Sequence, residues 1–134
     1  MLDKIIMTPF AFFLIFAFAV MAIMGMAMIH HWAAVQSEAQ AVASSMGKWG
    51  GYTDQANQLL TGFAQEMDIS VSDITVQVSD IGPIPYGQGI SVQLSVPFDF
   101  KLGNWNVGTF DLKGIGQSVS SYLGGYNVSY VYPI

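Results

Sequence analysis

This 134-residue sequence contains no cysteine and no arginine. The absence of cysteine excludes a disulfide framework, a zinc–thiolate site, thiol catalysis and the attachment of c-type haem. The absence of arginine leaves four lysines against nine acidic residues, which gives a net charge of −5. Nucleic-acid binding needs clustered Lys and Arg to neutralise the phosphate backbone, so we expect no nucleic-acid partner.

Charge of either sign is scarce, because charged residues make up 10% of the chain, against ~25% in an ordinary soluble domain. The deficit lies near the N-terminus, where no charged residue occurs between Lys4 and Glu38. Within this stretch the run from Ile5 to Ile29 is almost purely apolar. At ~1.5 Å per residue it forms a helix of about 37 Å, enough to cross a ~30 Å hydrocarbon core. The sequence therefore predicts one membrane-spanning helix.

A cleaved secretory signal is the alternative explanation of this run. Its apolar core would span only ~7–15 residues and would follow a more basic segment than Asp3–Lys4. We therefore expect a retained span, with the short N-terminus inside the cell and the polar, serine-rich remainder outside. The positive-inside rule supports this orientation only weakly, because Lys4 and Lys48 flank the span almost evenly.

The helical pattern continues from Trp32 to Met46, a stretch without glycine or proline. Bulky residues recur there at three- and four-residue spacing, and the spacing extends back into the apolar run. This heptad-like seam is the pattern by which one helix packs along a partner. The predicted seam residues are Met21, Gly25, Met28, Trp32, Val35, Ala39, Val42 and Met46.

The opposite side of the same helix carries small residues at every fourth position, which lets another backbone approach closely. These residues are Ala33, Ser37, Ala41 and Ser45. An amphipathic helix packed on its own domain explains the bulky side but not the uncharged small side, where a charged face is normal. We therefore predict one contact surface within the subunit and one between subunits.

The glycines at 47, 50 and 51 predict the end of this helix. Thr53 or Asp54 can cap a second helix over 56–67, where apolar residues have amphipathic spacing. From residue 74 the period changes to two, which predicts strands near 74–78, 90–102, 107–112 and 126–132. Pro97 places part of the longest strand at an edge or a bulge.

The predicted fold class is α+β, a long N-terminal helix packed against a small antiparallel sheet with one short extra helix. The helix occupies residues 1–51, with a transmembrane or filament-core part at 5–31 and an amphipathic half at 32–46. A small α+β head domain occupies residues 52–134.

No catalytic, metal or cofactor site is predicted. His30 and His31 cannot chelate one metal from a single helix, because adjacent helical residues point ~100° apart. They suit interfacial anchors beside Trp32, and an intersubunit metal or proton site is the alternative. The acids between Glu66 and Asp80 lack EF-hand spacing, so a solvated face is favoured over a calcium site.

Two further motifs are weak. The methionines at 21, 24, 26 and 28 allow a copper interpretation, although packing filler explains them more simply. The triplet that begins at Asn127 matches a glycosylation acceptor, a motif too short to be decisive.

The order of these parts resembles a type IV pilin, and in detail the TadE-like pseudopilins of Tad-type pili. In that family an apolar span leads into a Gln/Ala/Ser-rich helix, a glycine-containing break, a second helix and alternating strands. Here these parts are Ile5–Ile29, Trp32–Met46, Gly47–Thr53, Ala56–Met67 and the runs from Ile74 onward. The resemblance covers nearly the whole chain and is one of layout.

The resemblance implies a structural subunit that polymerises through its N-terminal helix into an extracellular, pilus-like filament at the cell surface. Its partners would be further copies of the chain, the cytoplasmic membrane before assembly and the pilus assembly machinery. The filament's role, whether adhesion, motility, DNA uptake or secretion, stays open. The alternative is a single-span membrane scaffold or minor pseudopilin of a secretion or conjugation apparatus, and an enzyme is not expected.

Two features depart from the pilin pattern. Pilins usually carry a glutamate at the fifth mature position, where this chain has Ile5, and Asp3 is the only nearby acid. No basic leader precedes the apolar run, so either a leader was removed before Met1 or processing differs. Asp3 is expected to pair with the amine of Met1 on an adjacent subunit, because an isolated charge is costly in an apolar core.

Overall fold

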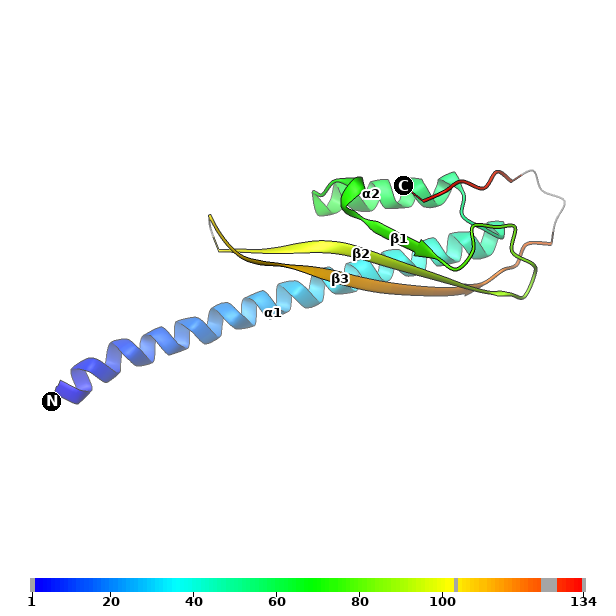
Figure 1. The fold of residues 1–134 in the computed structure, drawn as a ribbon. Coiled ribbons are helices and arrows are strands. Elements are labelled where there is room, and N and C mark those ends of the chain that lie inside the picture. Colours follow the sequence, from blue (N-terminus) through cyan, green and yellow to red (C-terminus); the bar gives the residue numbers. More distant parts are fainter. Residues whose placement is uncertain (1, 103, 124–127, 134) are drawn as a thin grey trace. The chain divides into compact units, whose positions relative to one another are not determined.

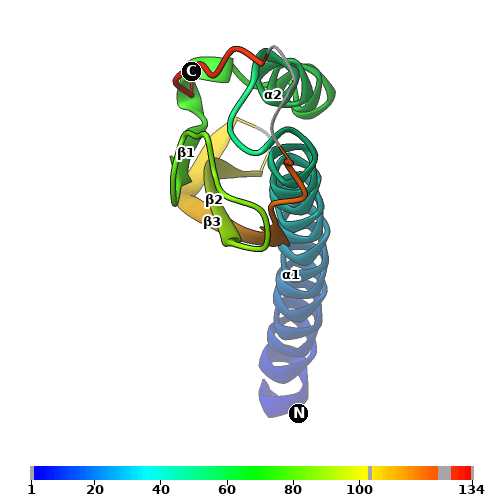
Figure 2. The same ribbon diagram turned by 90° about the vertical axis from the view of Figure 1, so that its right-hand side faces the viewer.

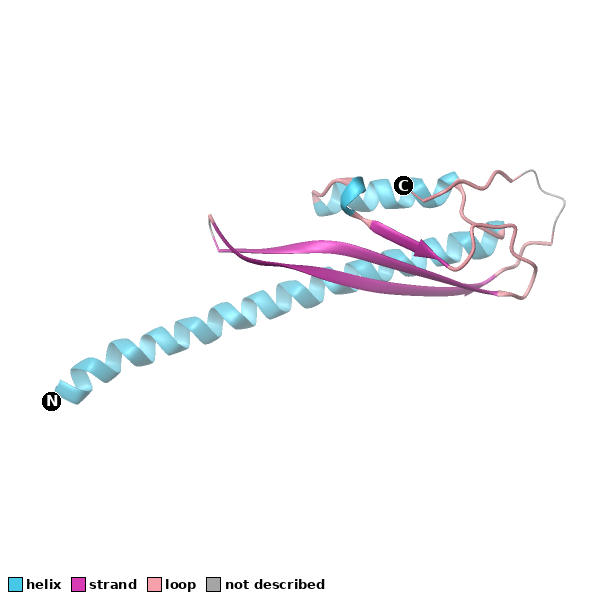
Figure 3. Ribbon diagram, viewed as in Figure 1, coloured by secondary structure: helices cyan, strands magenta, loops and turns pink. Residues whose placement is uncertain are grey.

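The computed structural model describes residues 2–102, 104–123 and 128–133. Figures 1 and 3 show its elements. They are helices α1 (Leu2–Trp49) and α2 (Asp54–Met67), the 3₁₀ turn η1 (Val71–Asp73) and strands β1 (Thr75–Val78), β2 (Gly89–Leu102) and β3 (Trp105–Val119). The predicted α+β class, with a long N-terminal helix, a short extra helix and an antiparallel sheet, is confirmed.

The chain divides into two compact units, Met1–His30 and His31–Ile134. The first is the apolar part of α1. The second, called the head below, contains α1 from His31 onward together with α2, η1 and the sheet. The predicted domains met after residue 51, whereas the head includes this part of α1 because Val35 and Met46 are fully buried in its core.

Helix α1 extends at both ends beyond residues 5–46, the stretch covered by the predicted apolar part and the predicted amphipathic half. It passes through Gly47 and ends at Trp49, so Gly47 does not stop it. Gly50 supplies the stop, because its φ of 71° is the left-handed conformation that terminates a helix. The N–H of Gly51 then donates to the carbonyl of Met46 at 3.1 Å, which satisfies one of the last free carbonyls.

The N-terminus of α2 lies where the sequence predicted it, but the expected cap is absent. Thr53 occupies the N-cap position without a side-chain hydrogen bond to the helix. Its Oγ1 is buried and has no hydrogen-bond partner. Of the two predicted cap residues, Thr53 thus occupies the N-cap position without a side-chain cap bond, and Asp54 is the first residue of the helix.

The sheet has the order β1-β2-β3 and is antiparallel throughout. Strands β2 and β3 form a long hairpin, with a register shift between Phe100 and Lys101. Strand β1 pairs only with residues 92–95 of β2, so the part of β2 that contains Pro97 is an unpaired edge on that side. The predicted edge position of Pro97 is confirmed, and its missing N–H suits such an edge.

Two strand predictions need correction. The run predicted at 107–112 is a strand that continues to Val119, and Gly114 and Gly116 interrupt the alternation that would have revealed it. The predicted strand at 126–132 does not form over 128–132, and residues 126–127 lie outside the described part of the chain. The tail instead joins the α1–α2 connection, where the N–H of Val131 donates to the carbonyl of Tyr52 at 3.0 Å.

The core of the head lies between the sheet and the two helices. Figure 2 shows α2 and the last turns of α1 on the same side of the sheet. The even-numbered residues of β2 from Ile90 to Val96 face this side and are at most 2% exposed. They meet buried residues of α1 and α2, which include Val35, Ala39, Val42, Ala43, Met46, Ala56, Leu60, Phe63 and Ala64.

Candidate assembly surfaces

The first unit is an apolar helix, and most of its large side chains are exposed. Their exposed fractions run from 73% at Leu2 to 41% at Leu14, and none of the best 18-residue span is buried. An apolar surface of this extent marks contact with lipid or with other protein. By length and composition this is the one helix among the described residues that is able to cross a membrane.

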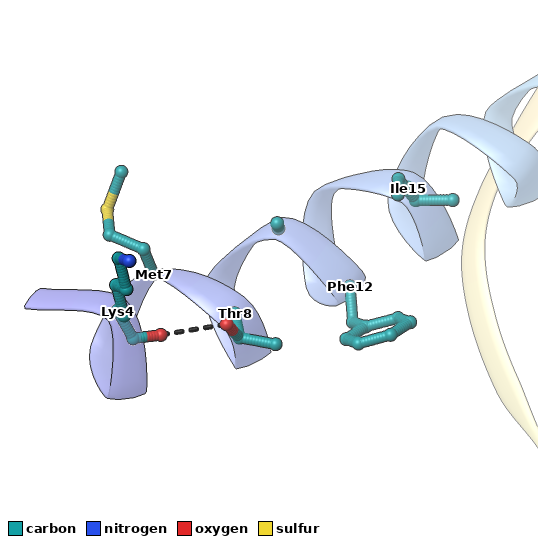
Figure 4. A pocket seen from close by; sticks show the side chains of 6 residues that line it. Lys4, Met7, Thr8, Phe12 and Ile15 are labelled. Atoms are coloured by element: carbon teal, nitrogen blue, oxygen red, sulfur yellow. Dashed lines mark hydrogen bonds between the residues drawn. The ribbon is translucent and has the colours of Figure 1, made fainter. Parts of the chain in front are cut away.

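A hollow of about 370 Å³ lies on this helix between Lys4 and Ile15. Figure 4 shows the lining side chains, among which Ala11 is small and Phe12 is bulky. A small residue surrounded by larger ones forms the kind of hole that accepts a side chain from a facing helix. Within it Thr8 Oγ1 donates to the carbonyl of Lys4 at 2.7 Å, so the hydroxyl is satisfied without water.

Pro9 lies inside α1, because the helix begins at Leu2 rather than at Ile5. Proline has no N–H, so the carbonyl of Ile5 lacks its usual donor four residues later. Of the residues predicted for assembly in this unit, Asp3 is exposed, Met21 is 56% exposed and Met28 is half-buried. A Cβ added at Gly25 would meet nothing within 4 Å. Their role between subunits stays a prediction.

The bulky seam in the head is turned toward the head's own core. Val35, Ala39, Val42 and Met46 are all 0% exposed. Trp32 differs, because its side chain is 47% exposed and its indole N–H donates to the carbonyl of Lys113 at 3.1 Å. In the head, these four seam residues therefore make contacts within the subunit.

Two glutamines of α1 seal the outer edge of β3, and the sequence analysis did not identify them. Gln36 Nε2 donates to the carbonyl of Ile115 at 2.5 Å, and Gln36 Oε1 accepts the N–H of Ile115 at 3.0 Å. Gln40 makes the same pair of bonds with Gln117, at 2.9 and 3.2 Å. Each amide thus replaces a missing neighbouring strand, which protects an edge that would otherwise recruit other chains.

The glutamines of α1 meet alternate residues of β3 because four residues of a helix and two residues of a strand have nearly the same length. Four residues of helix rise about 6.0 Å, and two residues of strand rise about 6.6 to 6.8 Å. Trp32, Gln36 and Gln40 are four apart and therefore meet alternate residues of β3. In the sequence only the four-residue spacing of these side chains and the glycines Gly114 and Gly116 are visible, and neither identifies β3 as the partner of α1.

The two glycines bring β3 against the backbone of α1. A Cβ at Gly114 would lie 2.7 Å from the carbonyl oxygen of Val35, and a Cβ at Gly116 would overlap the carbonyl oxygen of Ala39. Any side chain at either position would push the strand away and break the glutamine bonds. Close approach of backbones in the head thus depends on glycines of the strand and not on the predicted small ladder of the helix.

The small side of α1 faces outward at its start and toward α2 at its end. Ala33 and Ser37 are exposed, whereas Ala41 and Ser45 are half-buried. Beside Ser45 a hollow of about 530 Å³ opens between the two helices. It is lined by Ser44, Ser45, Lys48, Gln55, Gln58 and Leu59. In the head, Ala33 and Ser37 are the part of the predicted small ladder that is free for a second subunit.

Glu38, the only charge in the predicted helix between Lys4 and Lys48, is half-buried in the head. One carboxylate oxygen, Oε1, is buried without a hydrogen-bond partner. Burial, followed by repulsion from Glu66 on α2, raises the pKa of Glu38 to about 6. The charged form of the carboxylate is thus destabilised at neutral pH, and binding of a proton or an external cation would stabilise the site.

The α1–α2 connection is held by aromatic hydroxyls. Tyr52, which is fully buried, donates to Asn57 Oδ1 at 2.6 Å. Its burial raises the pKa of the phenol to about 12. Tyr130 of the tail donates to the carbonyl of Trp49 at 3.1 Å. The Tyr130 bond fastens the described part of the tail to the end of α1.

The predicted anchors at the end of the apolar run also have definite positions. The ring of His31 lies 4.5 Å from the ring of Phe98 on β2, which ties the hairpin to the start of the head's helix. No group of three or more metal-ligating side chains occurs within residues 2–102, 104–123 and 128–133. The predicted glycosylation acceptor Asn127 lies outside the described residues.

No protein-family model, no curated protein and no solved structure matches the chain. Two surfaces described above are open to other molecules, the exposed apolar helix of the first unit and the outward-facing residues Ala33 and Ser37 of the head.

Proposed function

We propose that this protein is a structural subunit of a pilus-like filament, anchored in the membrane by its apolar helix before assembly. The observation that carries the proposal is the exposure of that helix, in which none of the best 18-residue span is buried. Helices that are apolar on all sides exchange lipid contacts for helix contacts at little cost, because both surroundings offer similar dispersion contacts. Such a helix is suited both to anchoring in the membrane and to packing in a filament.

Assembly would join different surfaces of neighbouring copies. The hollow at Ala11 and the exposed positions Ala33 and Ser37 offer places where a second helix approaches closely. Contacts between unlike surfaces that do not close into a ring generate a helical polymer. The head, whose β3 edge is sealed at Ile115 and Gln117 by Gln36 and Gln40, would project from such a polymer.

The second candidate is a single-span scaffold or minor pseudopilin of a secretion or conjugation apparatus. The same exposed helix supports it, because lipid alone is sufficient to cover an apolar span. The two candidates differ in the small side of α1, which a scaffold has no need to keep small.

The test compares assembly with membrane retention. We expect electron microscopy of sheared cell-surface material to show filaments that contain this chain. Replacement of the exposed Ala33 by Leu should abolish them while the protein still folds and enters the membrane. Gln65→Leu, on the exposed side of α2, is the control and should leave filaments intact. Recovery only from detergent-extracted membrane, with Ala33→Leu fully tolerated, would establish the scaffold instead.

A further inference from the structure

The free edges of the sheet are protected in different ways, and the edge of β1 is the one left open. On β3 the peptide groups of Ile115 and Gln117 are bonded by the two glutamines of α1. On β2, beyond the end of β1, Pro97 has no N–H to offer to another strand. Both devices hinder pairing with other chains. Strand β1, which Figure 2 shows on the side of the sheet away from the last turns of α1, contains neither proline nor a charged residue.

The hydrogen-bond pattern shows which peptide groups of β1 point outward. The N–H of Ser79 donates to the carbonyl of Ser91 at 2.9 Å, so the backbone of Ser79 faces β2. In an antiparallel ladder only every second residue bonds to the same neighbouring strand. Counting back from Ser79 along the register, the N–H and C=O groups of Val76 and Val78 therefore point away from β2. Within the described part of the chain no other residue bonds to these four groups.

The side chains of β1 define what an added strand would carry. Val76 and Val78 pair with buried core residues of β2 and are themselves half-buried. Thr75 and Gln77 point to the opposite side of the sheet and are exposed. Residues that lie beside one another in neighbouring strands point to the same side. A strand added here therefore needs apolar side chains at alternate positions, to cover the two valines, and polar side chains between them.

Acidic side chains stand at both ends of this edge. Asp73 precedes β1 and Asp80 follows it, and both are exposed. Residues 49–95 as a whole carry five acidic residues and no lysine. A basic residue at each end of an added segment would thus meet opposite charge. A second copy of β1 fits poorly, because antiparallel pairing of two β1 edges would bring Asp73 of one copy near the Asp80 end of the other.

We propose that the free edge of β1 is the docking site for an extended segment of another protein, which joins the sheet as a fourth strand through the peptide groups of Val76 and Val78. The segment alternates apolar and polar residues and carries a basic residue at each end, opposite Asp73 and Asp80. In strand addition the main-chain hydrogen bonds supply affinity and the alternate side chains supply specificity. The inference goes beyond the proposed function, because it requires neither a filament nor a membrane.

A synthetic peptide tests the docking site. The probe is a fluorescein-labelled peptide of sequence KTVTVTVK, which has as many residues as the stretch from Asp73 to Asp80. Fluorescence polarisation measures its binding to the full-length protein in detergent. Two further peptides are N-methylated, one at its valines and the other at its threonines. A strand presents only alternate N–H groups to its neighbour, so only one of the two methylated peptides should lose binding.

Charge is tested with a pair of double variants. Asp73→Asn combined with Asp80→Asn should weaken binding of the peptide by about threefold or more at low salt, because two exposed ion pairs are lost. Asp54→Asn combined with Asp111→Asn is the matched control. It removes the same charge from exposed positions of the head away from this edge, and the peptide should bind it as it binds the wild type. Equal weakening by both double variants would overturn the proposed role of Asp73 and Asp80.

Amide exchange measured by NMR locates the bound peptide. We expect the exchange of the Val76 and Val78 amides to slow several-fold when the peptide is added, because their N–H groups gain acceptors. The Gln77 amide, which already faces β2, is the internal control. Absence of binding at millimolar peptide, or binding without protection of the two valine amides, would overturn the inference. Protection that needs no peptide and grows with protein concentration would also overturn it, by identifying a second copy as the occupant. None of these outcomes depends on whether the chain forms filaments, so this inference and the proposed function can fail separately.

Discussion

The side-chain amide of Gln36 pairs with the peptide group of Ile115 through both its nitrogen and its oxygen, at 2.5 and 3.0 Å. The pair has the donor–acceptor pattern of two neighbouring strands, yet one partner belongs to a helix. It shows how side chains of a helix close part of the free edge of a three-stranded sheet.

Removing this pair should weaken the head measurably. Gln36→Ala deletes two hydrogen bonds, each worth about 0.5–1.5 kcal/mol net, so we expect a loss of about 1–3 kcal/mol in the free energy of unfolding. Urea titration of the full-length protein in detergent measures it. Gln58→Ala is the control, since Gln58 bonds only to the exposed Asp54 side chain and should change stability little. An unchanged urea midpoint for Gln36→Ala would mean that the amide is not sealing the edge.

Gly116 tests the close approach of β3 to α1. A methyl group there would overlap the carbonyl oxygen of Ala39, so Gly116→Ala should destabilise the head by at least about 1–3 kcal/mol. The matched control is Gly62→Ala on α2, where an added Cβ meets nothing within 4 Å. That change should stabilise the helix by about 0.5–1 kcal/mol. Opposite shifts in the thermal midpoint are expected, and shifts of the same sign would contradict the packing described.

Glu38 should make stability depend on pH. The pKa of Glu38 is raised from 4.5 to about 6 in the folded head, so the folded state binds the proton more tightly than the unfolded state. Stability is then greatest below pH 4.5 and falls as pH rises through about 6. The full shift corresponds to about 2 kcal/mol, which we reduce to about 1 kcal/mol because the carboxylate is half exposed to solvent.

Glu38→Gln should remove that pH dependence and raise stability at pH 8, which unfolding curves at pH 5 and 8 would measure. Glu66→Gln, which removes only the secondary cause of the shift, should reduce the dependence without abolishing it. A wild-type stability that rises between pH 5 and 7 would show that Glu38 is not the dominant group in this range.

Thr53 should behave unlike an ordinary N-cap residue. Replacing an N-cap threonine usually costs about 1 kcal/mol, but the buried Thr53 hydroxyl makes no cap bond and has no partner. Thr53→Val keeps the shape and removes the unsatisfied group, so stability should rise by about 1 kcal/mol. A loss of stability in thermal unfolding would indicate that the hydroxyl forms the cap bond in solution.

The charge of Asp3 tests the predicted pairing between copies of the chain. It lies exposed in the first turn of α1, where a negative charge suits the helix dipole. If it pairs with the amine of a neighbouring Met1, Asp3→Asn should reduce the filament yield in sheared surface material without lowering membrane insertion. Asp73→Asn, an exposed acid in η1, is the control. Undiminished filaments from Asp3→Asn would refute the pairing; Met1 itself lies outside the described residues.

The presence of one long N-terminal helix, the position of α2 and the presence of a long strand through Pro97 followed from the sequence alone. Local rules suffice for these features, because unbroken apolar composition, amphipathic spacing and alternation each act within a few residues. The ability of α1 to cross a membrane also followed from the sequence, since it depends only on the length and composition of the helix.

Only the tertiary structure decided how the sheet ends. No pattern within 32–46 distinguishes Gln36 and Gln40 from solvated glutamines, because their partners stand nearly eighty residues later in the chain. Gly114 and Gly116 broke the alternation that would have revealed β3, and their reason is the backbone of α1 against which they lie. The described part of the tail is not a strand, and it bonds to the α1–α2 connection at Tyr52 and Trp49. Local sequence thus determined the helices and most of the strands, whereas packing between residues far apart in the chain determined which surfaces stayed exposed.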